Sequence, residues 1–261
     1  MNSPKSNEFY IGWKDGLPPR TRRLLILFIT ALFTFSLGIT YLVVKNQKPF
    51  NDHQFELGNI QEFSGVLVYN PAPMLLAEEG IPDSVSNELL LVGYGKRGAL
   101  GLLQEMEEEH GQLRQRRITL KGTLISGDGR AVLELTEKAK SLVAADEHEV
   151  FNQREISNPA PFQLQGEILD PKCYFGVMKP GEGKIHKSCA IRCISGGIPP
   201  VFRSIRSDGA FDYSLMKDAQ GQDINQRILP FVAENIEISG QSQRVGDWNV
   251  LYVDMDKIRR I

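Results

Sequence analysis

The residues best suited to chemistry in this sequence are its three cysteines and one nearby histidine. All the cysteines of the 261-residue chain fall within residues 173–193, and the four residues are Cys173, His186, Cys189 and Cys193. The histidine and the last two cysteines follow the spacing i, i+3, i+7, which places them on one face of an α-helix. Cys173 lies upstream and would fold back to join them. Thiolate and imidazole groups suit Zn²⁺ and Cu(I), so the pattern favours a metal site or thiol chemistry.

The sequence around these residues predicts a helix over 184–195. Gly181-Glu-Gly183 lets the chain enter the helix, Gly196-Gly197 supplies a residue with positive φ at its end, and Pro199-Pro200 prevents its continuation. The side chains expected to pack are Ile185, Ala190, Ile191 and Ile194. The basic side chains expected to favour thiolates over thiols are Lys172, Lys184, Lys187 and Arg192.

Three outcomes are open for this segment. In the first, Cys173, His186, Cys189 and Cys193 together bind one metal ion, Zn or Cu. In the second, Cys173 forms a disulfide with Cys189 or Cys193, and one thiol stays free because the cysteine count is odd. In the third, the thiols only pack in the interior and His186 lies at the surface. No C-x-x-C-H sequence is present, which disfavours covalent haem.

The remainder of the chain predicts a mainly β (α+β) fold with short helices. The expected elements of the first part are strands at 63–71, 87–92, 117–125 and 131–135, with a helix at 99–115. Gly166…Pro171 then echoes Gly65…Pro71, and Ile236–Gly240 echoes Ile118–Gly122. A five-stranded pattern with a helix between its third and fourth strands is typical of the OB fold, so we expect two tandem OB-like barrels. The alternative is a single mixed α+β domain with chance echoes.

An apolar, uncharged run at 24–44 predicts a transmembrane signal anchor, because it is long enough at 1.5 Å per residue to cross a bilayer core of about 30 Å. A cleaved signal peptide is disfavoured, since no small-residue cleavage site follows the run. The expected organisation is a cytoplasmic tail at 1–23, the anchor at 24–44, a linker at 45–56, OB-like units at 57–150 and 155–261, and a Cys/His insertion at 172–200.

Flanking charge predicts the orientation of the anchor. Five basic residues precede it, namely Lys5, Lys14, Arg20, Arg22 and Arg23, and only Lys45 and Lys48 follow it closely. The positive-inside rule then places the N-terminus in the cytoplasm. For a bacterial protein, this means a single pass through the inner membrane with the C-terminal region in the periplasm. That compartment is oxidising, which favours a disulfide.

Charge and motifs narrow the function classes. The net charge of −2 and the absence of a basic face give no indication of nucleic-acid binding. Gly93-Tyr-Gly-Lys-Arg-Gly98 matches G-x-G-x-x-G, but no acidic residue follows at the end of a second strand, so a glycine-rich turn is expected there. His53 and His148 belong to no pattern. No complete catalytic constellation is evident, which disfavours an enzyme.

The Cys/His segment resembles a segment found in many exported bacterial proteins, a largely uncharacterised group. Its pattern runs G-x-(V/I)-x-D-x-x-C-(Y/F), then H-x-x-C-A-x-x-C, then G-x-P. In this chain the match is carried by residues 166–174, 183–190, Cys193 and 197–200. The resemblance implies an exported setting and implies no activity. This chain differs from the pattern by its N-terminal additions, the membrane anchor and the first barrel-like unit.

Together these features predict a membrane-anchored, exported accessory or binding subunit of an envelope complex. Its expected partners are the lipid bilayer and a membrane protein or complex, and its Cys/His segment would bind metal or form a redox-sensitive disulfide. The first alternative is a thiol–disulfide oxidoreductase that uses Cys189 and Cys193. The second is a purely structural anchor subunit.

Overall fold

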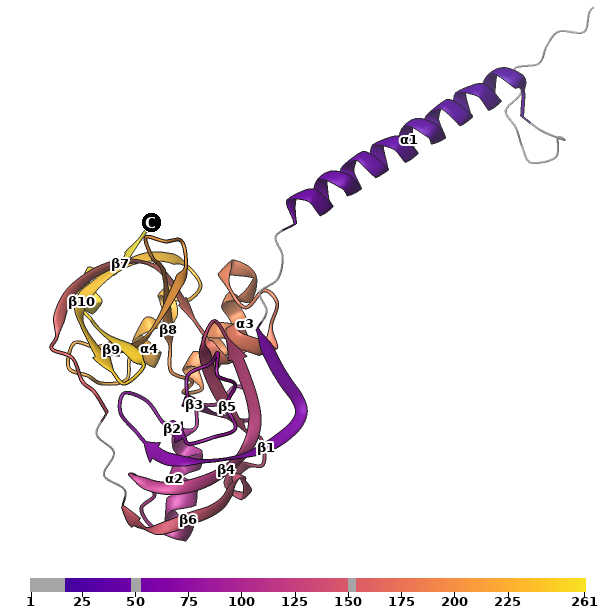
Figure 1. Ribbon diagram of the computed structural model, residues 1–261. Coiled ribbons are helices and arrows are strands. Elements are labelled where there is room, and N and C mark those ends of the chain that lie inside the picture. Colours follow the sequence, from indigo (N-terminus) through magenta and orange to yellow (C-terminus); the bar gives the residue numbers. More distant parts are fainter. Residues whose placement is uncertain (1–16, 48–52, 150–153) are drawn as a thin grey trace, which may run out of the picture. The chain divides into compact units, whose positions relative to one another are not determined.

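The computed structural model describes residues 17–47, 53–149 and 154–261 (Figure 1). The chain divides into two compact units, Met1–Pro49 and Phe50–Ile261. Parts of three predicted segments lie outside the described residues: positions 1–16 of the cytoplasmic tail, 48–52 of the linker and residue 150 of the first OB-like unit.

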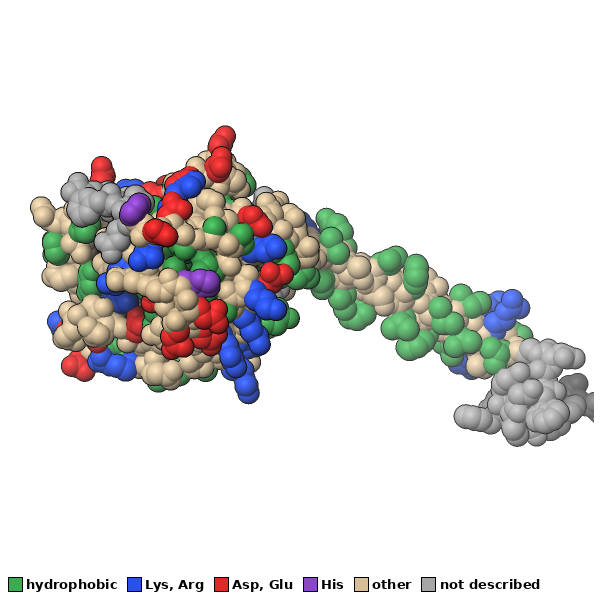
Figure 2. All heavy atoms as spheres, turned by 90° about the horizontal axis from the view of Figure 1, so that it is seen from below, with side chains coloured by type: hydrophobic (Ala, Val, Ile, Leu, Met, Phe, Trp, Pro, Cys, Tyr) green, Lys and Arg blue, Asp and Glu red, His purple; other side chains and the backbone are tan. Residues whose placement is uncertain are grey.

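The first unit contains one helix, α1 (Pro19–Asn46), which includes the whole predicted anchor. Its 28 residues span about 42 Å at 1.5 Å per residue. In length and composition this helix can cross a membrane, and apolar side chains run along it (Figure 2). The prediction of an N-terminal apolar helix is therefore confirmed.

The second unit begins with a closed five-stranded barrel. Its elements are β1 (Gln54–Val68), β2 (Met74–Ala77), β3 (Glu88–Gly93), α2 (Leu100–His110), β4 (Arg116–Gly127) and β5 (Arg130–Leu135), followed by η1 (Lys138–Ser141) and β6 (Leu142–Glu149). The strand order is β1-β2-β3-β5-β4, and β4 pairs back with β1. Only β3 and β5 are parallel within this barrel. Together with α2 between β3 and β4, this is the OB topology.

The same topology is repeated in the second barrel. Its elements are β7 (Ala160–Leu169), η2 (Cys173–Val177), α3 (Gly183–Ser195), β8 (Val201–Ile205), β9 (Phe211–Asp218), α4 (Asn225–Ile228), η3 (Leu229–Phe231), β10 (Asn235–Val245), β11 (Trp248–Val253), η4 (Met255–Lys257) and β12 (Arg259–Arg260). The order β7-β8-β9-β11-β10 closes through the pairing of β10 with β7, and β9 runs parallel to β11. The structure thus has two OB-like barrels, as predicted, and not a single mixed α+β domain.

Glycines in equivalent strands explain the internal echo in the sequence. A Cβ at Gly65 or Gly166 would lie 2.2 or 2.0 Å from a carbonyl oxygen of the neighbouring second strand of its barrel. A Cβ at Gly122 or Gly240 would lie 2.5 or 2.0 Å from a carbonyl oxygen of the fifth strand. Only glycine allows strands to approach so closely at the bends that close a small barrel. The repeated glycines are therefore a requirement of the repeated fold.

The two barrels share a core in addition to their own interiors. The first barrel has an interior cluster that includes Phe63 and Leu103, and the second has one that includes Phe202 and Ile236. A third cluster combines residues of both barrels. Its members are Ala72, Met74, Leu90, Val92, Ile125 and Val132 from the first barrel and Leu169, Cys173, Tyr174, Phe175, Cys193, Ile198, Val201, Tyr213, Leu215 and Trp248 from the second. The Cys/His segment therefore forms part of the contact between the barrels. On the face of this unit seen in Figure 2, side chains of both charge signs lie beside one another.

Candidate metal centre

The Cys/His segment connects β7 to β8, the first and second strands of the second barrel. It opens with a turn around Asp170, whose Oδ1 accepts the backbone N–H groups of Lys172 at 3.0 Å and Cys173 at 3.5 Å. The chain then forms the π-helical turn η2, in which the N–H of Met178 donates to the carbonyl oxygen of Cys173. Turns of this type are frequent at functional sites. This one directs Cys173 inward, where it is buried.

The predicted helix over 184–195 is confirmed as α3. It ends in a Schellman motif, in which Gly197 donates to the carbonyl oxygen of Ile194 and Ile198 donates to that of Cys193. Gly197 has φ +97°, as the sequence predicted for the Gly196-Gly197 pair. One packing expectation was wrong, because Ile185 is 86% exposed. On the helix it lies about 100° from His186, on the side away from the buried Ala190.

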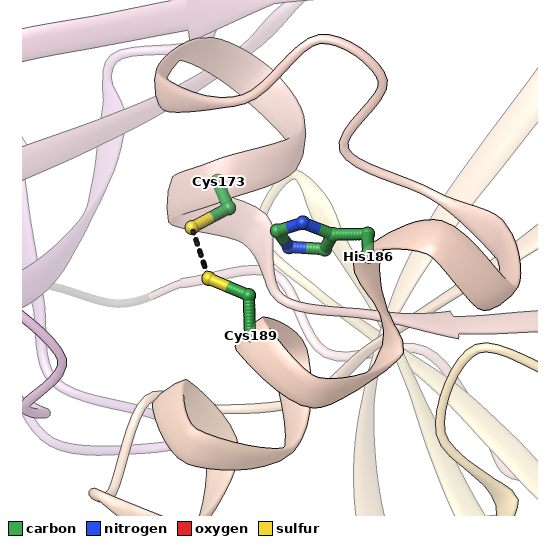
Figure 3. Close-up of side chains that lie close together, drawn as sticks. All are labelled: Cys173, His186 and Cys189. Atoms are coloured by element: carbon green, nitrogen blue, oxygen red, sulfur yellow. Dashed lines mark hydrogen bonds between the residues drawn. The ribbon is translucent and has the colours of Figure 1, made fainter.

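Cys173, His186 and Cys189 converge, and their potential ligand atoms all lie within 4.8 Å of one another. The sulfurs of Cys173 and Cys189 are 3.8 Å apart. This equals the edge of a tetrahedron built from Zn–S bonds of about 2.3 Å, which is about 3.8 Å. Figure 3 shows the imidazole of His186 directed toward the two sulfurs. Three of the four predicted ligands therefore lie close enough together that they could hold a soft metal ion.

His186 is buried without a hydrogen bond from either ring nitrogen to any described residue. The expectation that it would lie at the surface if the thiols only packed is therefore wrong, since its exposed fraction is 2%. Burial lowers the pKa of its imidazole, an effect that the nearby Asp170 carboxylate opposes and the Lys96 ammonium reinforces. The neutral imidazole is the form that binds metals. An unpartnered buried nitrogen costs about 1–3 kcal/mol, which metal coordination would relieve.

Cys193 belongs to a second group of potential ligands. Its sulfur lies 4.0 Å from that of Cys173, and these two residues form a triplet with Asp170 within 4.8 Å. The hydrogen bond with Cys193 is the main cause that raises the pKa of the Cys173 thiol, and burial and the Asp170 carboxylate raise it further. Sequence reasoning did not select Asp170 as a ligand, although Asp170 occupies the aspartate position of the pattern that the Cys/His segment resembles.

All three cysteines are free thiols. The sulfur separations of 3.8 and 4.0 Å exceed the bond length of about 2.05 Å in a disulfide. The predicted disulfide of Cys173 with Cys189 or Cys193 is therefore not present in the structure.

The cation at the thiols comes from the first barrel. Lys96 Nζ lies 2.9 Å from Cys189 Sγ, and this hydrogen bond is the main cause that raises the pKa of the lysine. Two of the lysines expected at the thiols have carboxylate partners. Lys172 is buried, and its Nζ lies 2.5 Å from Glu134 Oε1. Lys187 forms an ion pair with Glu234. No sequence pattern predicted that the 93–98 loop would supply this contact.

The 93–98 loop is a glycine-rich turn, as predicted, and it packs against the end of α3. The N–H of Gly98 donates to the carbonyl oxygen of Gly196 at 2.9 Å. A Cβ at Gly98 would lie 2.1 Å from the carbonyl oxygen of Gly197, and a Cβ at Gly196 would lie 1.9 Å from that of Lys96. Glycine on both sides brings the two backbones together and places Lys96 over the thiols.

A second polar cluster, which sequence reasoning missed, lies beside the first. His53 is buried, and its Nδ1 and Nε2 lie 3.0 Å from the carbonyl oxygen of Tyr174 and 3.0 Å from Asp128 Oδ2, respectively. The Tyr213 hydroxyl donates to Asp128 and is 2.9 Å from the Tyr174 hydroxyl. Arg203 donates to the Tyr174 hydroxyl at 3.1 Å. No local pattern identifies His53, because its partners are distant in the sequence.

Fold and site together define a protein with an N-terminal apolar helix and tandem OB-like barrels, whose Cys/His cluster has the geometry to bind a metal ion. No family model, curated protein or solved structure matches the chain.

Proposed function

We propose that the cluster of Cys173, His186, Cys189 and Cys193 binds a thiophilic metal ion, Zn²⁺ or Cu(I), in a membrane-anchored accessory subunit. The observation that carries this proposal is the buried, unpartnered imidazole of His186 beside two sulfurs 3.8 Å apart. Neutral imidazole and thiolates are the donors that both ions favour. The metal would hold η2 and α3 together at the contact between the barrels.

The setting of this function follows from α1 and the resemblance. We propose that α1 anchors the chain in the inner membrane of a bacterial cell, with the barrels on the periplasmic side, because the basic residues before the apolar run at 24–44 outnumber those that follow it closely. The resemblance of the Cys/His segment to exported bacterial proteins supports the same placement. A tethered chain without a complete catalytic constellation then acts as a binding or accessory subunit of an envelope complex.

A direct measurement tests the metal proposal. The full chain, without a histidine tag, is extracted in detergent under anaerobic conditions, and bound metals and free thiols are measured together. We expect at least one soft metal ion per chain and a lower metal content in Cys189→Ser. Metal below about 0.1 per chain after Zn²⁺ or Cu(I) loading would refute the proposal.

A second candidate function is a thiol–disulfide switch. Cys173 Sγ lies 3.8 Å from Cys189 Sγ, Cys189 is half-buried, and an ammonium contacts its sulfur. Cys173 and Cys189 would lose two protons and two electrons to an oxidised dithiol partner as the S–S bond forms. The geometry favours this pair over the predicted Cys189–Cys193 pair, since Cys173 contacts both other sulfurs. Peptide mapping after oxidation of the metal-free protein tests the pairing, and Cys173–Cys189 is the expected product.

A further inference from the structure

Asp170 is fully buried beside the thiols, and its charge is not balanced by a described side chain. Its Oδ1 caps the turn into η2, but its Oδ2 has no hydrogen-bond partner among the described residues. The ammonium of the nearby Lys172 contacts Glu134 and the carbonyl oxygens of Gly93 and Gly95. A buried carboxylate oxygen without a partner is costly, and a cation beside it removes that cost.

The atoms needed to hold such a cation are present. Asp170, Cys173 and Cys193 bring their potential ligand atoms within 4.8 Å of one another, as do Cys173, His186 and Cys189. The two triplets share Cys173. We infer that the cluster binds two metal ions, one in each triplet, with the Cys173 thiolate as the bridge between them. This inference rests on the proposed function and extends it from one ion to two.

Charge favours two ions over one. When ionised, the three thiolates and the Asp170 carboxylate carry four negative charges, and two divalent cations neutralise them. A single divalent ion would leave two negative charges in a buried site, where an uncompensated charge is strongly unfavourable. Lys96 offsets little of this because it is exposed and contacts only the half-buried Cys189.

The number of donor groups in the cluster also favours two ions. A single Cys₃His site would satisfy a tetrahedral ion with the four predicted residues and would leave Asp170 Oδ2 unpartnered. Two ions with a shared thiolate use all five donors. Each ion then has three protein ligands and one open position, as in catalytic rather than structural zinc sites. The open positions would accept water or a donor atom from a partner.

Metal stoichiometry tests the inference. The untagged full chain in detergent is reduced, stripped of metal, loaded with Zn²⁺ and passed over a chelating resin before metal and protein are measured. We expect about two Zn²⁺ per chain in the wild type and about one in Asp170→Asn, which keeps the shape of the side chain. Asp218→Asn, a control at another buried carboxylate of the second barrel, should keep about two.

Cobalt substitution tests the bridge. Two Co²⁺ ions joined by one thiolate couple magnetically, so the electron paramagnetic resonance signal of the first ion should fall as the second binds. In Asp170→Asn the signal should persist.

About one metal per chain in the wild type would overturn the two-ion inference and leave the proposed function intact, whereas no metal would overturn both. Two ions without magnetic coupling would overturn the bridge. If Asp170→Asn does not fold, as judged by near-ultraviolet circular dichroism, the wild-type stoichiometry and coupling decide alone.

Discussion

The ammonium of Lys96 lies 2.9 Å from the sulfur of Cys189, and these residues belong to different barrels. The contact makes the thiol environment a property of the whole two-barrel unit. Cys189 is also the only half-buried thiol, since Cys173 and Cys193 are buried. It is therefore the sulfur that solvent and reagents reach first.

This relationship predicts the order of thiol alkylation in the reduced, metal-free protein. Iodoacetamide should modify Cys189 before Cys173 and Cys193, as read by peptide mass spectrometry. Lys96→Met should slow the reaction by up to about fivefold, because an exposed charge contact contributes at most about 1 kcal/mol. Lys184→Met is the control, since Lys184 is exposed on the same helix; an equal slowing in that variant would contradict a specific role for Lys96.

The backbone contact between the 93–98 loop and the end of α3 predicts the effect of a single methyl group. Gly98→Ala would place Cβ 2.1 Å from the carbonyl oxygen of Gly197, so the loop must move. We expect a loss of about 1–3 kcal/mol in the free energy of unfolding and weaker metal binding.

Gly101→Ala provides the matched control for that substitution. Gly101 lies in α2 with nothing within 4 Å of an added Cβ, so the change should stabilise the helix by up to about 1 kcal/mol. Urea unfolding followed by circular dichroism compares the two variants. Equal stabilities would show that the close approach at Gly98 is not required.

The buried ion pair of Lys172 and Glu134 joins the Cys/His segment to the first barrel. Their side chains are 6% and 5% exposed. Lys172→Met should lower the free energy of unfolding by about 3–5 kcal/mol, because it leaves the Glu134 carboxylate buried without its cation. The double variant Lys172→Met, Glu134→Leu should recover most of that loss, since both charges are gone. Thermal unfolding measures this, and a double variant no more stable than the single one would refute the explanation.

Local sequence signals were sufficient to predict the elements that carry the site. The glycine and proline residues around α3 fix its ends through backbone geometry, and the Asp-Gly turn at 128–129 correctly indicated the β4–β5 hairpin, in which Gly127 pairs with Arg130. The repeated glycines indicated two barrels because each close strand approach recurs in both. These signals act over a few residues, so a single sequence contains them.

The contacts that complete the site could not be predicted in this way. Lys96, Asp170 and His53 acquire their roles from residues brought together across the two barrels or by the turn into η2. Lys172 was expected near the thiols because it adjoins Cys173 in sequence, but its side chain extends to Glu134 instead. Sequence proximity indicates which residues share a segment, and only packing determines which side chains meet.

The Asp128 carboxylate predicts an acid-dependent component of stability. Its hydrogen bond with His53 is the main cause that lowers the pKa of this carboxyl, and the Tyr213 hydroxyl lowers it further, while burial opposes both. A lowered folded-state pKa contributes stability that is present above the unfolded-state value of about 4 and is lost as the pH falls through the folded-state value.

Asp128→Asn should therefore be less stable than the wild type at pH 7. The loss should be less than about 1 kcal/mol, because the carboxylate is partly exposed, and the stability of the variant should fall less steeply below pH 4. Urea unfolding across pH 2.5–7 measures how the free energy of unfolding of each protein changes with pH. Asp256→Asn is the control at an exposed carboxylate outside this cluster, and its stability should follow that of the wild type across the same pH range. Parallel pH profiles for wild type and Asp128→Asn would contradict the assignment, since Asp128 would then have the same proton affinity in the folded and unfolded chains.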